Sequence, residues 1–200
     1  MTQTPSPPPT YMLAPSKPKL QVPPDACDAH VHVMGPASRF AFANVNLSKS
    51  DAPKEKLFAL HEFLGIEHCL IVHTQSHGYD FSVTVDALAA KGGAYKGVAL
   101  VPVTISDAEL KRLDALGFCG ARFHFMPPLD GGPSIGEAIA FGKRLADIGW
   151  HLQIHMDGSL IAELSAALSR SPVPVVIDHM GRIDASRGLQ QPEFRALLAL

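Results

Sequence analysis

Short apolar runs recur along the chain from Asp25 onward, and longer segments with helix-like patterning separate them. The runs have the length of strands, and we expect strands at residues 26–33, 68–74, 97–103, 118–126, 150–156 and 173–178. The segments between them predict helices at residues 52–64, 80–91, 106–116, 134–148 and 158–169, with another beginning near Pro192. This rhythm of strand, helix and strand is typical of parallel βαβ units.

Residues at the helix ends support these boundaries. Ser106 is expected to be an N-cap residue, with Glu109 three positions later completing a capping box. Gly117 and Gly149 lie where C-terminal caps are expected, because glycine adopts the left-handed conformation readily.

The pattern contains six βα units, whereas a (β/α)₈ barrel of the TIM type has eight and typically about 250 residues. The two explanations are an incomplete barrel and an open six-stranded α/β sheet. Open sheets of this kind usually carry a dinucleotide signature, and no GxGxxG motif follows the first strand. We therefore favour an incomplete (β/α)₈ barrel at residues 25–200, preceded by a proline-rich tail at residues 1–24.

Composition and charge exclude several classes of partner. The formal net charge is -2 without a run of Lys or Arg, so nucleic acid and anionic membranes are not expected partners. The apolar runs are far shorter than the roughly 20 residues of a membrane helix. Cys27, Cys69 and Cys119 are widely spaced beside apolar runs, as reduced core cysteines are, which favours the cytoplasm. These features predict no particular oligomeric state.

Histidines at strand ends are the candidate catalytic or metal-binding residues. Alternation along the first strand places Asp28, His30 and His32 on one face, at the carboxyl end where barrel active sites lie. Two imidazoles so placed can converge on one metal ion or one substrate oxygen, although a hydrogen-bonded pair without chemistry is the alternative.

Two further strands end in the same way. His151, Gln153 and His155 share one face of the fifth strand, and such a polar row is costly unless it meets a ligand, a metal or polar partners. Internal satisfaction of Gln153 and a solvated His151 are the alternatives, and His155, nearest the carboxyl end, is the functional candidate. The sixth strand ends in Asp178 and His179, where the acidic residue can set the histidine tautomer.

Polar residues on two other strands are candidates for substrate binding. Arg122, which shares a face of the fourth strand with His124, suits an anionic substrate group. Its alternative is an ion pair with an interior carboxylate such as Asp28. Ser76 and His77 lie in a polar loop after the second strand and could contact substrate. A Gly-x-Ser-x-Gly elbow is absent from the sequence, which disfavours serine hydrolase chemistry of that type.

Five segments, in this order, resemble the amidohydrolase-related family, and within it the 2-pyrone-4,6-dicarboxylate lactonase branch. They are residues 25–36 (DACDAHVHVMGP) with Arg39-Phe40, residues 76–78 (SHG), residues 120–123 (GARF), Trp150-His151 and residues 176–182 (VIDHMGR). The resemblance implies a (β/α)₈ barrel that hydrolyses a cyclic ester, with water activated by an aspartate at the end of the eighth strand.

The resemblance also implies roles for individual residues. Histidines matching His30, His32 and His179 polarise the scissile carbonyl, and arginines matching Arg122 and Arg182 hold substrate carboxylates. The lactonase branch is described as working without a divalent metal, whereas most of its relatives use one.

The sequence departs from the lactonase pattern at three places. The eighth strand would lie beyond Leu200, Pro128 replaces a second arginine, and His155 replaces a tyrosine. A histidine at that fifth-strand position matches the metal-ligand pattern of the wider superfamily. We therefore expect that His30, His32 and His155 could hold zinc or manganese, with His179 contacting substrate, and metal-independent catalysis is the alternative.

The sequence thus predicts a hydrolase acting on a small carboxylated lactone. A non-oxidative decarboxylase of the same broad family is the second hypothesis. The third is an inactive, truncated chain that at most binds ligand, because a barrel without its last two strands leaves two sheet edges exposed.

Overall fold

The computed structural model describes residues 11–43, 47, 50–127, 129 and 132–200. The chain divides into two compact units, residues 1–100 with 116–118 and residues 101–115 with 119–200. Pro128 and residues 1–10 of the expected tail lie outside the described residues.

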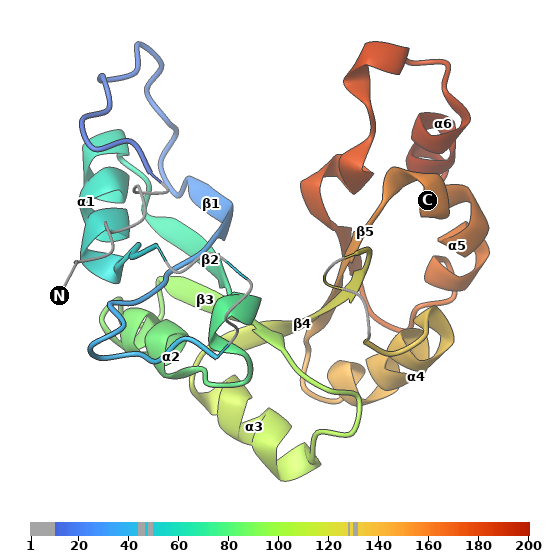
Figure 1. The fold of residues 1–200 in the computed structure, drawn as a ribbon, viewed down its shortest axis with the longest axis horizontal. Helices are drawn as coiled ribbons and strands as arrows, with labels where there is room; N and C mark the ends of the chain where they lie inside the picture. Colours follow the sequence, from blue (N-terminus) through green and yellow to red (C-terminus); the bar gives the residue numbers. More distant parts are fainter. Residues whose placement is uncertain (1–10, 44–46, 48–49, 128, 130–131) are drawn as a thin grey trace, which may run out of the picture. The chain divides into compact units, whose positions relative to one another are not determined.

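The first unit contains three parallel strands and two longer helices (Figure 1). Its elements are β1 (Cys27–Val31), α1 (Lys54–Leu64), β2 (His68–Val72), the 3₁₀ turn η1 (Gln75–His77), α2 (Ser82–Ala89) and β3 (Tyr95–Leu100). In register, Asp28 of β1 lies beside Cys69 of β2, which lies beside Tyr95 of β3. Leu57 and His61, one helical turn apart on α1, are both buried, as are Ile71 and Val98 on the strands.

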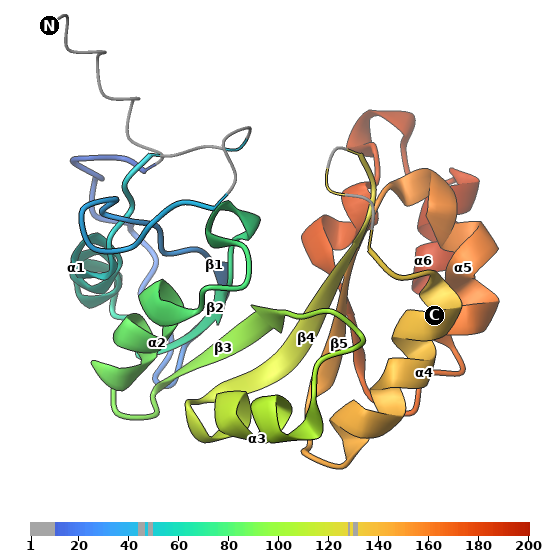
Figure 2. The same cartoon turned by 60° about the horizontal axis from the view of Figure 1, so that its bottom comes forward.

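The second unit continues the same alternation. Its elements are α3 (Asp107–Ala115), β4 (Phe118–Phe125), α4 (Ile135–Ala146), β5 (His151–Met156), η2 (Gly158–Leu160), α5 (Ile161–Leu168), β6 (Val175–Ile177), η3 (Asp178–Arg182), η4 (Ala185–Arg187) and α6 (Pro192–Leu198). β4 begins at Phe118, which belongs to the first unit. In both ribbon views α4 and α5 lie on the same side of β5 (Figure 2). The core includes Leu113, Leu145, Trp150 and Leu152.

Strand order decides between the two expected folds. The six strands follow one another in the sheet in chain order, from β1 to β6, and the register of the pairs β1–β2, β2–β3, β4–β5 and β5–β6 is parallel. An open doubly wound sheet reverses its strand order at a switch point, whereas a (β/α)₈ barrel keeps chain order. The βα repeat is therefore that of a TIM-type barrel, with six units present.

Each expected strand and helix is found, with shifted ends. The sixth strand is shorter than expected, because Pro174 has no N–H to donate to the ladder and a tight turn begins at Asp178. The expected polar loop at Ser76 and His77 is instead the 3₁₀ turn η1, in which both residues are buried. Ser106 accepts from the Glu109 N–H at 3.2 Å, as expected, but the Glu109 carboxylate pairs with Arg112 and leaves the capping box half formed.

Other surface features bear on the expectations from composition. The described start of the tail, at Tyr11 to Leu13, lines a cavity of about 340 Å³ together with residues of α1. Cys69 is buried, whereas Cys27, at the start of β1, is exposed and is not the core cysteine that we expected.

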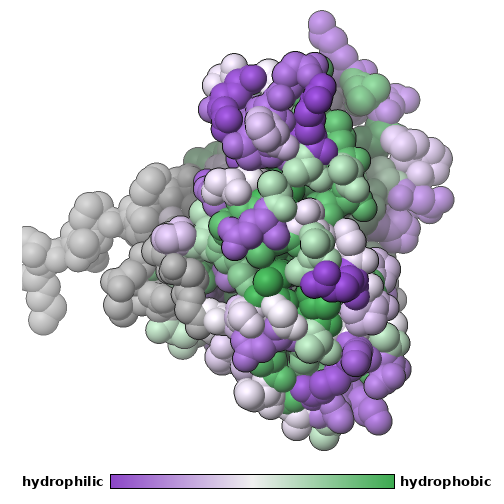
Figure 3. Space-filling view, turned by 90° about the vertical axis from the view of Figure 1, so that its right-hand side faces the viewer, coloured by the Kyte–Doolittle hydropathy of each residue, from purple (hydrophilic) through white to green (hydrophobic). Residues whose placement is uncertain are grey.

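On the face of the second unit that carries α5 and α6, hydrophobic and hydrophilic residues are mixed (Figure 3). Among the described residues, no helix has both the length and the apolar character needed to cross a bilayer.

Candidate active site

His30 and His32 lie side by side at the carboxyl end of β1. Their ring centroids are 5.2 Å apart, with the rings nearly perpendicular, so the expected common orientation of this pair is found. His32 Nδ1 lies 2.7 Å from the carbonyl oxygen of Val72, which can only accept. The proton of a neutral His32 is therefore on Nδ1, and the lone pair is on Nε2, the arrangement of a ligating or accepting histidine.

Asp28 does not follow the simple alternation that we expected. The register between β1 and β2 shifts between Asp28 and Val31, as at a β-bulge. The Asp28 Oδ2 atom lies 3.2 Å from Nε2 of His61 on α1, and the Asp28 Oδ1 atom accepts from the His30 N–H at 3.2 Å. The hydrogen bond from His61 lowers the pKa of the Asp28 carboxyl group against the opposing effect of burial.

His77 and Ser76 are held inside the first unit. His77 Nδ1 lies 2.9 Å from the carbonyl oxygen of Ala41, and its Nε2 accepts from the Gly35 N–H at 3.3 Å. Both ring nitrogens therefore have protein partners, and the binding of substrate by Ser76 and His77 stays a prediction.

His73, at the end of β2, is fully buried beside this turn. Its Nε2 lies 3.1 Å from the Gly78 carbonyl and its Nδ1 lies 2.8 Å from the Thr84 hydroxyl. Burial lowers the pKa of His73 to about 4, so the ring is neutral at pH 7.

Asp178 is the centre of a buried polar cluster in the second unit. Arg122 donates from Nε to Asp178 Oδ2 at 2.6 Å, and Gln153 donates to Asp178 Oδ1 at 2.5 Å. Burial of the guanidinium lowers the pKa of Arg122, and the Asp178 charge opposes this effect. The alternative of an ion pair is thus found, with Asp178 as the partner in place of Asp28, and Gln153 is satisfied internally.

This cluster anchors the turn that carries His179. After Asp178, the backbone φ angles of His179, Met180 and Arg182 are 51°, 52° and 50°, a left-handed region that non-glycine residues rarely adopt. Each such residue costs on the order of 1 kcal/mol, so the surrounding structure must fix the turn. The buried Asp178 carboxylate provides that anchor, while His179 and Arg182 are exposed.

His155 lies between two other imidazoles. Its Nδ1 is 3.1 Å from Nδ1 of His124, and its ring centroid is 4.9 Å from that of His179. Its Nε2 is buried and finds no hydrogen-bond partner among the residues that the structure describes. Burial, with the nearby charge of Arg122, lowers the pKa of His155 to about 4, so a neutral imidazole is present at pH 7.

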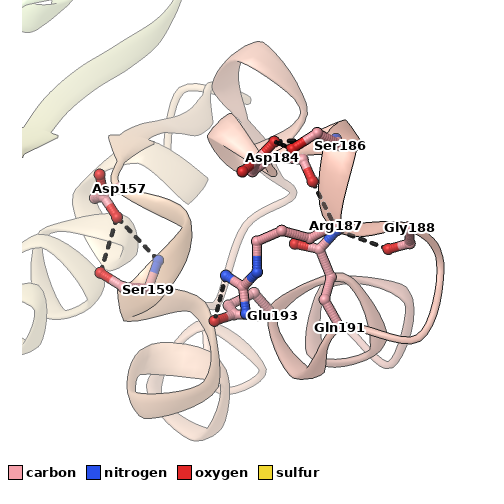
Figure 4. A network of polar contacts seen from close by, with 8 residues as sticks. All are labelled: Asp157, Ser159, Asp184, Ser186, Arg187, Gly188, Gln191 and Glu193. Atoms are coloured by element: carbon pink, nitrogen blue, oxygen red, sulfur yellow. Dashed lines mark hydrogen bonds and ion pairs between the residues drawn. The ribbon is translucent and has the colours of Figure 1, made fainter.

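Polar contacts also secure the segments beside the His179 turn (Figure 4). The Asp157 carboxylate caps η2 by accepting from the N–H and hydroxyl of Ser159, and Asp184 does the same for Ser186 in η4. Gln191 donates to the carbonyl oxygens of Asp184 and Gly188. The chain after Arg182 is therefore tied to the start of α6.

Comparison with known proteins gives a consistent picture. The family model described as amidohydrolase matches residues 27–200. A 2-pyrone-4,6-dicarboxylate hydrolase of Comamonas testosteroni is 39% identical over 185 residues, covering 92% of this chain and 61% of the relative. A 4-sulfomuconolactone hydrolase of Hydrogenophaga intermedia is 31% identical over 186 residues, covering 91% of this chain and 61% of the relative. The chain thus spans about three-fifths of the length of these relatives.

Solved structures agree with the fold. A structure from Pseudomonas putida, assigned as a 2-pyrone-4,6-dicarboxylic acid hydrolase, has a TM-score of 0.76 and 29% identity, covering 90% of this chain and 66% of that one. A zinc-bound amidohydrolase of Burkholderia multivorans shares the fold, with a TM-score of 0.61 at 15% identity over 88% of this chain and 66% of that one. Because the family model matches residues 27–200 and the Comamonas testosteroni relative is 39% identical over 92% of this chain, the chain belongs to the amidohydrolase family.

Proposed function

We propose that this protein hydrolyses a small lactone that carries carboxylate groups. The observation that carries the proposal is the 39% identity, across 92% of the chain, to a relative named as a pyrone dicarboxylate hydrolase. A second relative is named for hydrolysis of a sulfonated lactone, so both names describe the opening of an anionic cyclic ester. The net charge of -2 and the lack of a basic run favour a small molecule over a nucleic acid as partner.

His30, His32 and His179 are the proposed catalytic residues. A histidine N–H directed at the carbonyl oxygen stabilises the negative charge that develops when water attacks the carbonyl carbon, a role open to His30 and His179. Because the Nδ1–H of a neutral His32 is held by the Val72 carbonyl, His32 would contribute through its Nε2 lone pair, as a ligand of the metal proposed below. Within the first unit, the rings of His30 and His32 contact each other edge to face, and within the second unit His179 is exposed on its anchored turn. Each ring is therefore presented by a fixed backbone segment.

Arginines are the proposed carboxylate-binding groups. Arg182 is exposed on the same turn as His179, which suits a bidentate contact with a substrate carboxylate. Arg122 already pairs with Asp178, so we propose that it keeps this partner when it contacts substrate. We also propose that Ser76 and His77 contribute to substrate binding by holding the shape of the η1 turn.

A divalent metal fits the donor chemistry of three histidines, His30, His32 and His155. The buried Nε2 of His155 has no partner among the described residues, and in the neutral tautomer that donates from Nδ1 to His124 the Nε2 lone pair suits zinc or manganese. His32 has the tautomer of a ligand whose Nδ1–H is held by a carbonyl. When bound, a metal would lower the pKa of a coordinated water toward neutrality.

The test of the metal is elemental analysis of purified protein, with activity measured before and after chelation. We expect metal content to fall in His155→Gln, and activity that is lost on chelation to return with zinc or manganese. Unchanged activity in metal-free protein would reject the metal. Free cysteines at positions 27, 69 and 119 favour a reducing compartment, and we propose the cytoplasm.

The test of the function is turnover of a panel of carboxylated lactones, followed by acid release in a pH-stat. We expect His30→Ala and His179→Ala each to lower kcat/KM by about 100-fold or more, with unchanged far-ultraviolet circular dichroism. Near-normal turnover in both variants would remove the catalytic assignment. Release of CO₂ in place of a hydroxy acid would indicate the decarboxylase.

A further inference from the structure

Asp28, His61 and Tyr95 form a continuous chain of polar contacts in the first unit, and it ends on the backbone of His30. The Tyr95 hydroxyl lies 2.6 Å from His61 Nδ1, His61 Nε2 lies 3.2 Å from Asp28 Oδ2, and Asp28 Oδ1 accepts from the His30 N–H at 3.2 Å. Each carboxylate oxygen therefore has its own donor.

The sheet register explains how one helical residue reaches two strands. Asp28, Cys69 and Tyr95 lie side by side on β1, β2 and β3, and the His61 ring from α1 joins Asp28 to Tyr95 across the middle strand. His61 and Tyr95 are each 1% exposed, so water does not compete for the contact between them, whereas the Asp28 side chain is 31% exposed. Burial raises the pKa of Tyr95 to about 12, so its hydroxyl keeps its proton.

The polarity of the chain follows from the carboxylate, which can only accept. His61 must then carry a proton on Nε2, and in the neutral ring Nδ1 accepts from the Tyr95 hydroxyl. The donors thus point in sequence from Tyr95 to His61 to Asp28.

His30 lies where the ladder between β1 and β2 is irregular. The register shifts between Asp28 and Val31, and the His30 N–H donates to the Asp28 side chain. The hydrogen bond to Asp28 therefore holds this peptide in place at the bulge.

We propose that Asp28, His61 and Tyr95 are positioning residues that fix the backbone of His30, and through it the direction of the His30 imidazole. This inference rests on the proposed function of His30. Groups that orient a functional histidine typically cost 10- to 100-fold in activity or affinity when removed, roughly the range expected here.

The experiment combines kinetics on the proposed lactones with amide hydrogen exchange of His30 by nuclear magnetic resonance. We expect Asp28→Ala to lower kcat by about 10- to 100-fold with KM changed less than about two-fold, and to speed His30 amide exchange about ten-fold or more. Asp28→Asn keeps an oxygen that can accept from His30, and its NH2 group can donate to His61 Nε2 when the neutral ring carries its proton on Nδ1 and donates to Tyr95, so it should restore most of the kcat and the protection. Tyr95→Phe removes a single oxygen atom and should lower kcat by about three-fold or more, and it carries the test if Asp28→Ala does not fold.

The matched control is Asp114→Ala, which removes the 3.0 Å hydrogen bond from Trp150 Nε1 in the second unit without touching His30. Equal effects of Asp28→Ala and Asp114→Ala on kcat and on His30 exchange would overturn the proposal, as would unchanged His30 exchange in both Asp28→Ala and Tyr95→Phe. Absence of lactone turnover in the unmodified protein would count against the proposed function alone, because the exchange measurement tests the network without substrate.

Discussion

The guanidinium of Arg122 and the carboxylate of Asp178 form a buried ion pair inside the second unit, with side chains 5% and 1% exposed. The pair joins β4 to the first residue of the turn that presents His179. Because the backbone of that turn is left-handed at several non-glycine residues, its geometry depends on a firm anchor.

Breaking this pair on one side should be strongly destabilising. Asp178→Asn leaves the Arg122 charge buried without its partner, and we expect the free energy of unfolding to fall by about 3–5 kcal/mol. Urea unfolding followed by circular dichroism measures the change. The control is Glu109→Ala, which removes the exposed pair with Arg112 and should leave the free energy of unfolding almost unchanged. A loss below about 1 kcal/mol in Asp178→Asn would show that the pair is not the anchor.

Two neighbouring residues of the turn should respond in opposite ways. Met180 is 82% exposed with a positive φ, so Met180→Gly should leave the unfolding free energy unchanged or raise it by up to about 1 kcal/mol. A Cβ on Gly181 would lie 2.6 Å from Ile161 Cδ1, so Gly181→Ala should lower it by about 1–3 kcal/mol. Thermal or urea unfolding of both variants checks the contrast, and equal effects would contradict it.

Two buried histidines predict a loss of stability in mild acid. The pKa values of His73 and His155 are lowered to about 4, whereas an unfolded histidine titrates near 6.5. Between these values the unfolded chain binds protons that the folded protein does not. The stabilising contribution of the two neutral histidines is therefore fully present above pH 6.5 and is lost as the pH drops toward 4.

Each of these histidines should contribute up to about 1.4 kcal/mol per pH unit to that slope. Unfolding free energies of the wild type, His73→Gln and His155→Gln at pH 7.5, 5.5 and 4.5 provide the measurement. Each substitution should flatten the dependence by about that amount. An unchanged slope in both variants would exclude them as the titrating groups.

A side chain at Gly120 on β4 should lower the stability of the protein. A Cβ at this position would lie 2.4 Å from Cε1 of His151, a ring held on the adjacent strand β5. Gly120→Ala should therefore lower the unfolding free energy by about 1–3 kcal/mol. The double variant Gly120→Ala with His151→Ala should recover part of the loss, and additive losses would contradict the contact.

Local patterns predict the elements of this protein well. The alternation of apolar runs with helix-like segments gives the six βα units, and the motif at His30 and His32 gives their common orientation, because both depend on neighbours in sequence. Strand order could not be read from periodicity, yet the lack of a dinucleotide motif pointed to the correct fold.

Side-chain contacts between residues far apart in the chain could not be predicted from the sequence. Alternation places Arg122 on an inward face but cannot choose between Asp28 and Asp178, and the true partner lies 56 residues away. The bulge after Asp28 was not foreseen because no glycine marks it. His61 was missed as well, although its spacing of one helical turn from Leu57 on the buried face of α1 was an available signal.

Incorporation of oxygen from labelled water tests lactone hydrolysis most directly. When a carboxylated lactone is turned over in ¹⁸O water, attack on the carbonyl carbon predicts one ¹⁸O atom in the new carboxylate of the hydroxy-acid product and none in its hydroxyl group. Mass spectrometry of the product reads both positions. Turnover with no label in the carboxylate, or with release of CO₂, would contradict the proposed chemistry.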